Sequence, residues 1–217
     1  MGAAITHFQE GGWGMWAILL ITTIPILVII VERAIVLLKA RIDKNRLLAL
    51  LKSQIMAGNV QGAIKVCAGQ QTPLTHILQA GLAKYNRPDA EIQAAMDESA
   101  LHELPLIEKR TGYLAMLGNL ATLLGLLGTI TGLIKSFAGV AGVDPSMKAT
   151  LLARGISEAM NCTAFGLGTG IVGLLLFAIL NGRTQHLLDD INEVSVQLMN
   201  LVSAHKQAMK GGGSVAA

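Results

Sequence analysis

The chain has 217 residues, of which 52% are hydrophobic and 14% charged, and its formal net charge is +3 at pH 7. Soluble domains carry about 25% charged residues, so this composition excludes an ordinary soluble globular protein and favours a bilayer as the surroundings. A pI near 9.0 is compatible with nucleic-acid binding, but aromatic residues are too few for stacking platforms beside a basic patch. We therefore expect a membrane protein without a nucleic-acid partner.

Three charge-free apolar runs are found along the chain. They cover Gly11 to Val31, Thr111 to Ile134 and Ala159 to Gly182, with lengths of 21, 24 and 24 residues. About 20 helical residues cross a hydrocarbon core, and in lipid the backbone has to satisfy its own hydrogen bonds. The sequence thus predicts an all-α membrane protein with three transmembrane helices and long cytoplasmic helical extensions.

The first run is predicted to stay in the mature protein. A secretory signal begins with a basic region and ends at a small-residue cleavage site. Here Met1 to Glu10 contain no Lys or Arg, and the run ends in "VERAIVLLKAR".

Basic residues predict the orientation in the membrane. Of the 17 basic residues, 3 lie in the segments expected on one side and 14 in those expected on the other. Positive residues mark the cytoplasmic side, so we expect the amino terminus outside and the carboxyl terminus in the cytoplasm. The predicted regions are an outer segment with helix one (1–38), a cytoplasmic helical region (39–110), helices two and three with a short outer connection (111–182), and a cytoplasmic helix with a flexible tail (183–217).

The cytoplasmic region is predicted to hold short helices separated at Gly58-Asn59, Thr72-Pro73 and Arg87-Pro88. Threonine before proline suits an N-cap followed by the first helical position. From Asp89 the apolar residues recur every three or four positions, which predicts one long helix that enters the membrane with a kink at Pro105. Helix three is expected to continue inward on the apolar stripe Leu187, Ile191, Val194, Leu198 and Leu201, before a flexible end "KGGGSVAA".

Helices two and three each carry a face of small and hydroxyl-bearing residues. With residues about 100° apart around a helix, these faces include the glycines Gly118, Gly125, Gly132, Gly166, Gly170 and Gly173 and the threonines Thr122, Thr129, Thr163 and Thr169. On helix two, an arc of large apolar residues lies opposite this small-residue face, and Thr131 lies outside both. Two interpretations stay open: close helix packing through small residues, or an ion pathway lined by hydroxyls.

Glu158 lies directly before the third run. Carboxylates near membrane segments are costly and often mark ion pathways. The alternative is a plain surface pair with Arg154, one helical turn earlier and in the weaker orientation for charges four residues apart.

No carboxylate lies in the middle of helix two or three. Hydroxyls can coordinate a cation but do not release a proton near neutral pH, so the group that carries the ion is expected from another polypeptide. The residues show no nucleophile-and-base arrangement, no phosphate loop, and no metal spacing among the cysteines and histidines. We expect no enzyme, no metal and no cofactor.

The motifs "ATLLGLLGTITGLIKSF" and "GISEAMNCTAFGLGTGI" closely resemble the paired signatures of the MotA/TolQ/ExbB proton-channel family. The stretch "GGWGMWAILL...IVERAIVLL" resembles the first helix of its three-helix ExbB/TolQ branch. The resemblance implies a homopentamer around the membrane helices of two copies of a partner similar to ExbD or TolR, which carries an essential aspartate. It also implies that Thr129 and Thr163 are pore threonines and that Glu158 is the glutamate of helix three.

The sequence departs from many family members at two places where they have proline. It has Thr122 after Ala121, and it has Val172 after the helix-three glycines. Thr122 and Thr169 add hydroxyls, which leaves a sodium-coupled site open beside a proton-coupled one. Our prediction is a pore-forming subunit of an energy transducer driven by an ion-motive force, with Thr129, Thr163, Glu158, Thr122 and Thr169 in the ion pathway. The alternatives are a structural membrane scaffold and a self-sufficient ion channel.

Overall fold

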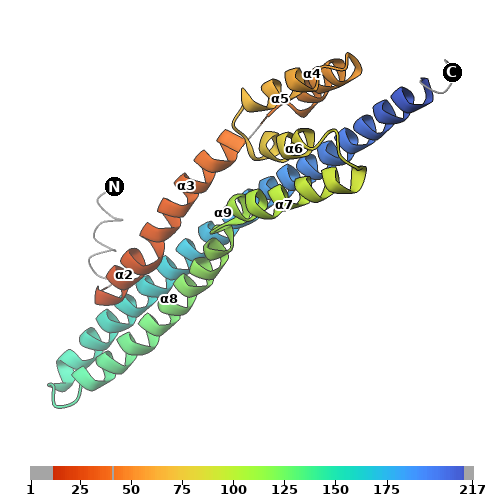
Figure 1. The fold of residues 1–217 in the computed structure, drawn as a ribbon. Helices are drawn as coiled ribbons and strands as arrows, with labels where there is room; N and C mark the ends of the chain where they lie inside the picture. The colour runs from red at the N-terminus through yellow and green to blue at the C-terminus, as the bar shows by residue number, and fades with distance from the viewer. Residues whose placement is uncertain (1–11, 41, 213–217) are drawn as a thin grey trace. The chain divides into compact units, whose positions relative to one another are not determined.

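The structure is a computed structural model that describes residues 12–40 and 42–212, and the regular elements in that part of the chain are all helical (Figure 1). Within these residues, three stretches are long and apolar enough to cross a membrane, contained in Gly14–Met56, Asp89–Gly139 and Pro145–Met209. The predicted class, an all-α membrane protein, is confirmed.

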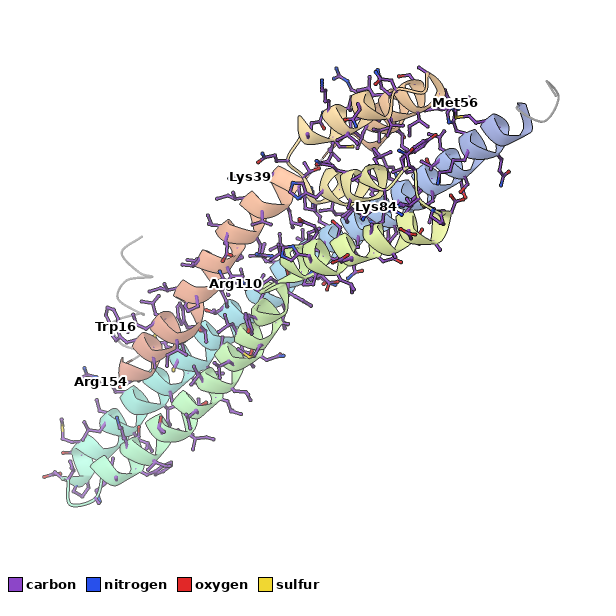
Figure 2. All side chains as sticks on the ribbon, viewed as in Figure 1. Trp16, Lys39, Met56, Lys84, Arg110 and Arg154 are labelled. Carbon is purple, nitrogen blue, oxygen red and sulfur yellow. The ribbon has the colours of Figure 1, made fainter. Side chains whose placement is uncertain are left out.

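The chain divides into two compact units, which we describe separately. Unit 1 comprises the described residues of 1–33 together with 110–181, and unit 2 comprises the described residues of 34–109 together with those of 182–217. In Figure 2, side-chain nitrogen and oxygen atoms are sparse along the helices of unit 1 and frequent in unit 2.

The first apolar run is helical but not uniformly α-helical. It forms α2 (Gly12–Ile18), a π-helical turn η1 (Leu19–Thr23) and the start of α3 (Ile24–Ala40). Pro25 has no N–H and its ring crowds the preceding turn, and a wider π turn just before it relieves this crowding. The Thr22 hydroxyl donates to the carbonyl of Ile18 at 2.6 Å, which satisfies this buried polar group inside the helix.

In unit 1, α8 (Thr111–Gly139) lies side by side with the first part of α9 (Pro145–Gly212) (Figure 1). Most large apolar residues of α8 opposite its small residues are exposed on this chain, among them Leu123 at 62% and Ile134 at 62%. Exposed apolar surface on this scale indicates contact with lipid or with another protein.

The prediction of one long helix from Asp89 into the membrane is wrong, because the chain leaves the helical conformation at Arg110. Helix α7 (Asp89–Glu108) contains Pro105 and continues beyond it, with the Lys109 amide still donating to the Pro105 carbonyl at 2.9 Å. The break falls at Arg110, whose φ of 66° is left-handed and ends right-handed helix. Arg110 stands at the junction of α7 and α8 in Figure 2.

The short helices of unit 2 are separated at the three places that the sequence predicted, Gly58-Asn59, Thr72-Pro73 and Arg87-Pro88. Helix α4 (Lys44–Met56) is capped by Asp43, α5 (Val60–Ala68) by Asn59, and α6 (Pro73–Ala83) by a capping box between Thr72 and Thr75. Each cap accepts hydrogen bonds from amides that have no partner inside the helix. The predicted cap at Thr72 with Pro73 in the first turn is confirmed.

Helices α6 and α7 form a hairpin with a tight core. Leu74, Ile77, Leu78 and Leu82 of α6 are buried, as are Ile92 and Met96 of α7. Gly81 permits this approach, since a Cβ atom there would lie 2.5 Å from Cγ of Met96.

In unit 2, charges join α9 to the short helices. The Lys44 ammonium contacts Asp190 at 2.6 Å and Glu193 at 2.7 Å, and Lys206 contacts Asp89 at 2.9 Å. Of the predicted apolar stripe, Ile191, Val194 and Leu198 are buried, while Leu187 and Leu201 are half-buried.

Two predictions lie partly or wholly outside the described residues. The outer segment Met1 to Glu10 is one of them. The other is the flexible end, of which Lys210 to Gly212 belong to α9 while the remaining residues are outside the described part of the chain.

Candidate ion-pathway site

The site is built on the interface between α8 and the first part of α9. The two helices are antiparallel, because contacts pair Gly118 with Gly170, Gly125 with Gly166 and Gly132 with Ala159. Along α8 these glycines recur every seventh residue, which is two helical turns, so they form one stripe. Two stripes of small residues facing each other let the helix backbones approach closely.

The space beside each glycine is filled by the other helix. A Cβ atom at Gly125 would lie 3.1 Å from Cα of Gly166, and one at Gly118 would lie 3.1 Å from the carbonyl oxygen of Gly170. At Gly173 an added Cβ would lie 3.2 Å from Ile26 of α3 and 3.3 Å from Cα of Gly118. All six glycines singled out in the sequence therefore lie where helices of one chain pack together.

Thr129 and Thr163 meet across this interface. Their hydroxyl oxygens are 2.8 Å apart, and both residues are half-buried. The Thr163 hydroxyl can donate its proton to the carbonyl of Gly125 at 3.0 Å or to the hydroxyl of Thr129. The Thr129 hydroxyl can donate to the carbonyl of Leu126 at 2.8 Å. Each hydroxyl has a single proton to donate but also accepts, so the pair offers oxygen lone pairs at the edge of the interface.

Thr122 and Thr169 are not part of this pair. The Thr122 hydroxyl donates to the carbonyl of Gly118 at 3.3 Å, two turns along α8 from Thr129. Thr169 lies 3.5 Å from the hydroxyl of Thr23 in η1, so it faces the first membrane helix. The structure thus brings together two of the four threonines predicted for the pathway.

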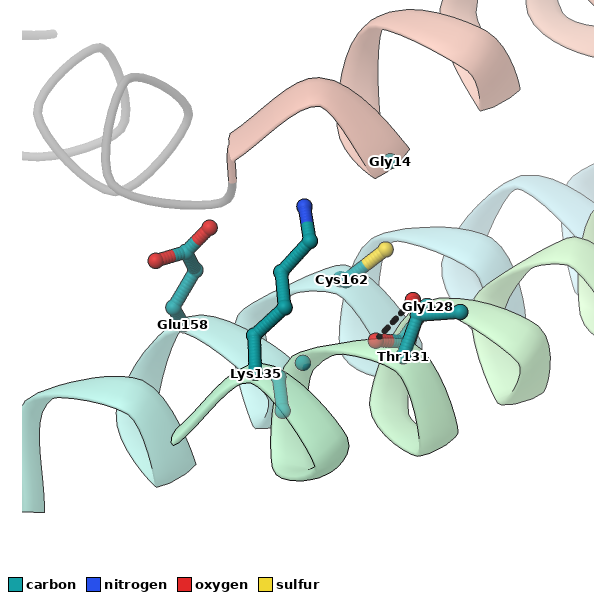
Figure 3. A pocket seen from close by; sticks show the side chains of 8 residues that line it. Gly14, Gly128, Thr131, Lys135, Glu158 and Cys162 are labelled. Carbon is teal, nitrogen blue, oxygen red and sulfur yellow. Dashed lines mark hydrogen bonds between the residues drawn. The ribbon is translucent and has the colours of Figure 1, made fainter. Parts of the chain in front are cut away.

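Glu158 also lies away from the threonine pair. It is exposed, and five residues separate it from Thr163, which places it roughly 140° away around α9. It lines a small cavity with Lys135 and Thr131 of α8, Cys162 of α9 and Gly14 of α2 (Figure 3). Arg154, the alternative partner of Glu158, makes no ion pair with it in the described structure.

Sequence reasoning missed Lys135 and Thr131 as companions of Glu158. One signal was present, because Thr131 fell outside both arcs of helix two. The position of Thr131 could not be linked to Glu158, because this requires the antiparallel register of α8 and α9. Projections of the two helices drawn separately do not show that register.

The sequence profile of the MotA/TolQ/ExbB proton channel family matches residues 69–193, which is 125 of the 217 residues. This match includes α6, α7, α8 and most of α9, and with it both threonines of the pair. The chain belongs to the MotA/TolQ/ExbB proton channel family, and it is a membrane protein. No curated protein matches the chain.

Proposed function

We propose that this chain is the pore-wall subunit of an energy transducer of the bacterial inner membrane, in the three-helix ExbB/TolQ-like branch, where proton flow drives a partner subunit to do work on the envelope or on a motility machine. Its amino terminus faces outward and its carboxyl terminus lies in the cytoplasm. The chain assembles as a homopentamer around the single membrane helices of an ExbD/TolR-like partner, which is itself a dimer.

The observation that carries the proposal is the hydroxyl pair Thr129–Thr163, with oxygens 2.8 Å apart at the edge of an interface made of small residues. Oxygen lone pairs at this position can hold a water or stabilise a proton on a neighbouring carboxylate. Neither helix supplies a carboxylate at this depth, so the partner has to bring the group that takes up and releases the ion.

The test replaces both threonines by valine, which keeps the shape and removes the hydroxyls. We expect Thr129→Val with Thr163→Val to abolish proton uptake by vesicles that contain the chain and its partner, while the assembly keeps its mass. The matched control is Thr129→Ser with Thr163→Ser, which retains the hydroxyls and is expected to retain uptake. Full proton uptake by the valine double variant would refute the proposal.

A structural scaffold is the second candidate, and the packing of the six glycines favours it. The two threonine hydroxyls also bond within the chain, which a scaffold would use for stability. A scaffold predicts silent hydroxyl losses and destructive Gly→Leu substitutions. The valine double variant therefore separates the two candidates, and copurification with mass measurement identifies the partner that the first one requires.

A further inference from the structure

Helix α7 of unit 2 carries an exposed leucine on an acidic face. Leu101 is 78% exposed, the largest fraction among the large apolar residues of the described chain. Glu98 and Asp97 lie three and four residues before it, so their exposed carboxylates are on the same side of the helix. A single exposed leucine is common on protein surfaces, so its meaning depends on the other surfaces of the unit.

A groove between α4 and α9 is the apolar counterpart of this leucine within the same unit. Four leucines line it, of which Leu51 and Leu198 are buried and Leu48 and Leu201 half-buried. The volume of the groove is about 230 Å³, whereas one water needs roughly 10–15 Å³. The groove is therefore large enough to take an apolar side chain from another surface.

The charges of α4 complement those of α7. Helix α4 contains three basic residues and no acidic one, while α7 contains six acidic residues and no Lys or Arg. Lys52 lines the groove, and like Glu98 beside Leu101 it is exposed. Among the described residues, neither of these two charges has an ion-pair partner. Opposite charges of this kind speed association and fix the register of an interface.

Leu101 does not reach the groove of its own chain. On α7, the buried Ile92 and Met96 face Gly81 of α6, and Leu101 lies roughly 140–180° around the helix from them. It therefore points away from α6. Figure 1 shows α4 and α7 on opposite sides of α6 within unit 2, so the surface that covers Leu101 has to come from another molecule.

We propose that Leu101 of one copy of this chain inserts into the α4–α9 groove of a second copy, where Glu98 of the first copy lies beside Lys52 of the second. The two surfaces differ, so the contact is head-to-tail and every copy offers both halves of it. Repeated head-to-tail contacts close into a ring when the rotation between copies allows it. The inference rests on the homopentamer of the proposed function, and it adds the surface through which unit 2 of neighbouring copies is joined.

A disulfide cross-link between two differently tagged copies in membranes tests this contact. One copy carries Leu101→Cys and the other carries Ala49→Cys, an exposed position that lines the groove. We expect a mild oxidant to link the two tags, while the native Cys67 and Cys162 are buried. The matched control is Leu50→Cys, because Leu50 is exposed on the same helix but does not line the groove. It is expected to link far less.

A charge exchange tests the same contact without a covalent bond. We expect Glu98→Lys to weaken the assembly by about tenfold, because two positive charges then meet at the groove. Adding Lys52→Glu to the same chain is expected to restore the assembly, since each interface regains a pair of opposite charges. Mass measurement over a dilution series follows both changes.

The outcomes separate this inference from the proposed function. An assembly of full mass without the link between positions 101 and 49, or with equal linking at position 50, would overturn the inference and leave the proposed function intact. A link from position 101 to the partner subunit would overturn it as well, since a different surface would then cover Leu101. A chain that stays monomeric in the membrane would overturn the inference and the proposed function together.

Discussion

Arg110 and Glu32 are joined by two contacts, since Nη1 of Arg110 lies 2.7 Å from each carboxylate oxygen of Glu32. Arg110 is also the residue at which α7 and α8 are separated, with a left-handed φ of 66°. A left-handed backbone costs a non-glycine residue about 1–2 kcal/mol. The ion pair therefore holds a strained residue at the start of the second membrane helix.

Substitutions at Arg110 separate the backbone strain from the ion pair. Arg110→Ala and Arg110→Gly both remove the pair with Glu32, but only glycine adopts a left-handed φ without a steric penalty. We expect the glycine variant to be more stable than the alanine variant by about 1 kcal/mol. The measurement compares their melting temperatures in detergent, and equal values would show that the residue leaves the left-handed region once the pair is lost.

The helix interface gives a second prediction, based on two glycines of α9. A Cβ atom at Gly166 would lie 2.7 Å from both the carbonyl oxygen of Ala121 and Cα of Gly125, which are backbone atoms. We expect Gly166→Ala to destabilise the chain by about 1–3 kcal/mol, because the helices have to separate.

Gly168 is the matched control for Gly166, because beyond its chain neighbours and the nearby backbone of its own helix, no described atom lies within 4 Å of a Cβ at that position. Alanine is a better helix former than glycine by about 1 kcal/mol, so Gly168→Ala is expected to raise the melting temperature. Opposite shifts for two alanines only two residues apart would be specific to the interface. Shifts of the same sign would contradict the packing described here.

Local chemistry explains which features the sequence predicted well. The helix boundary at Gly58-Asn59 and the cap at Thr72 depend on residues within three positions, and the apolar runs depend on composition alone. The small-residue stripes were predictable for the same reason. Their partners were not, because a helical projection shows that Gly125 belongs to a stripe but not that Gly166 of the same chain fills the space beside it.

Features that depend on distant residues were missed. The break at Arg110 was not predicted, because it involves Glu32 of another helix, whereas the local sequence indicated only a kink at Pro105. The association of Glu158 with Lys135 requires the register of two antiparallel helices. The direction in which Thr169 points becomes clear only when Thr23 is placed beside it, in a π turn that the apolar pattern does not reveal.

A third prediction concerns Cys67, a thiol in α5 that lies buried in unit 2. Burial raises the pKa of this thiol from 9.0 to about 11. Because the thiolate is the reactive form, alkylation at pH 8 is expected to be much slower than at Ala68→Cys, an exposed position on the same helix. Mass spectrometry of the labelled peptides measures both rates, and equal rates would contradict the burial of Cys67.

The same shift gives a pH dependence with a defined sign. The folded pKa of Cys67 lies above its unfolded value, so the native state binds the proton more tightly. Its contribution to stability is fully present below pH 9 and is lost as the pH rises towards 11. We expect Cys67→Ala to make stability less sensitive to pH in this window, as measured by urea unfolding. An identical pH dependence in the variant would assign the loss to other groups.

The last prediction concerns Lys206, which connects the carboxyl-terminal part of α9 to the turn between α6 and α7. Its ammonium donates to the carbonyl of Arg87 at 2.6 Å and contacts Asp89 at 2.9 Å, and it lies 5.6 Å from the ring centre of Tyr85. We expect Lys206→Met to destabilise this connection by about 1 kcal/mol, since hydrogen bonds to a charged group are lost. Hydrogen exchange of the amides of residues 84–92 should then accelerate about fivefold. Lys84→Met, an exposed lysine in the same turn, is expected to leave this exchange unchanged. Equal acceleration in both variants would mean that Lys206 acts only through the net charge.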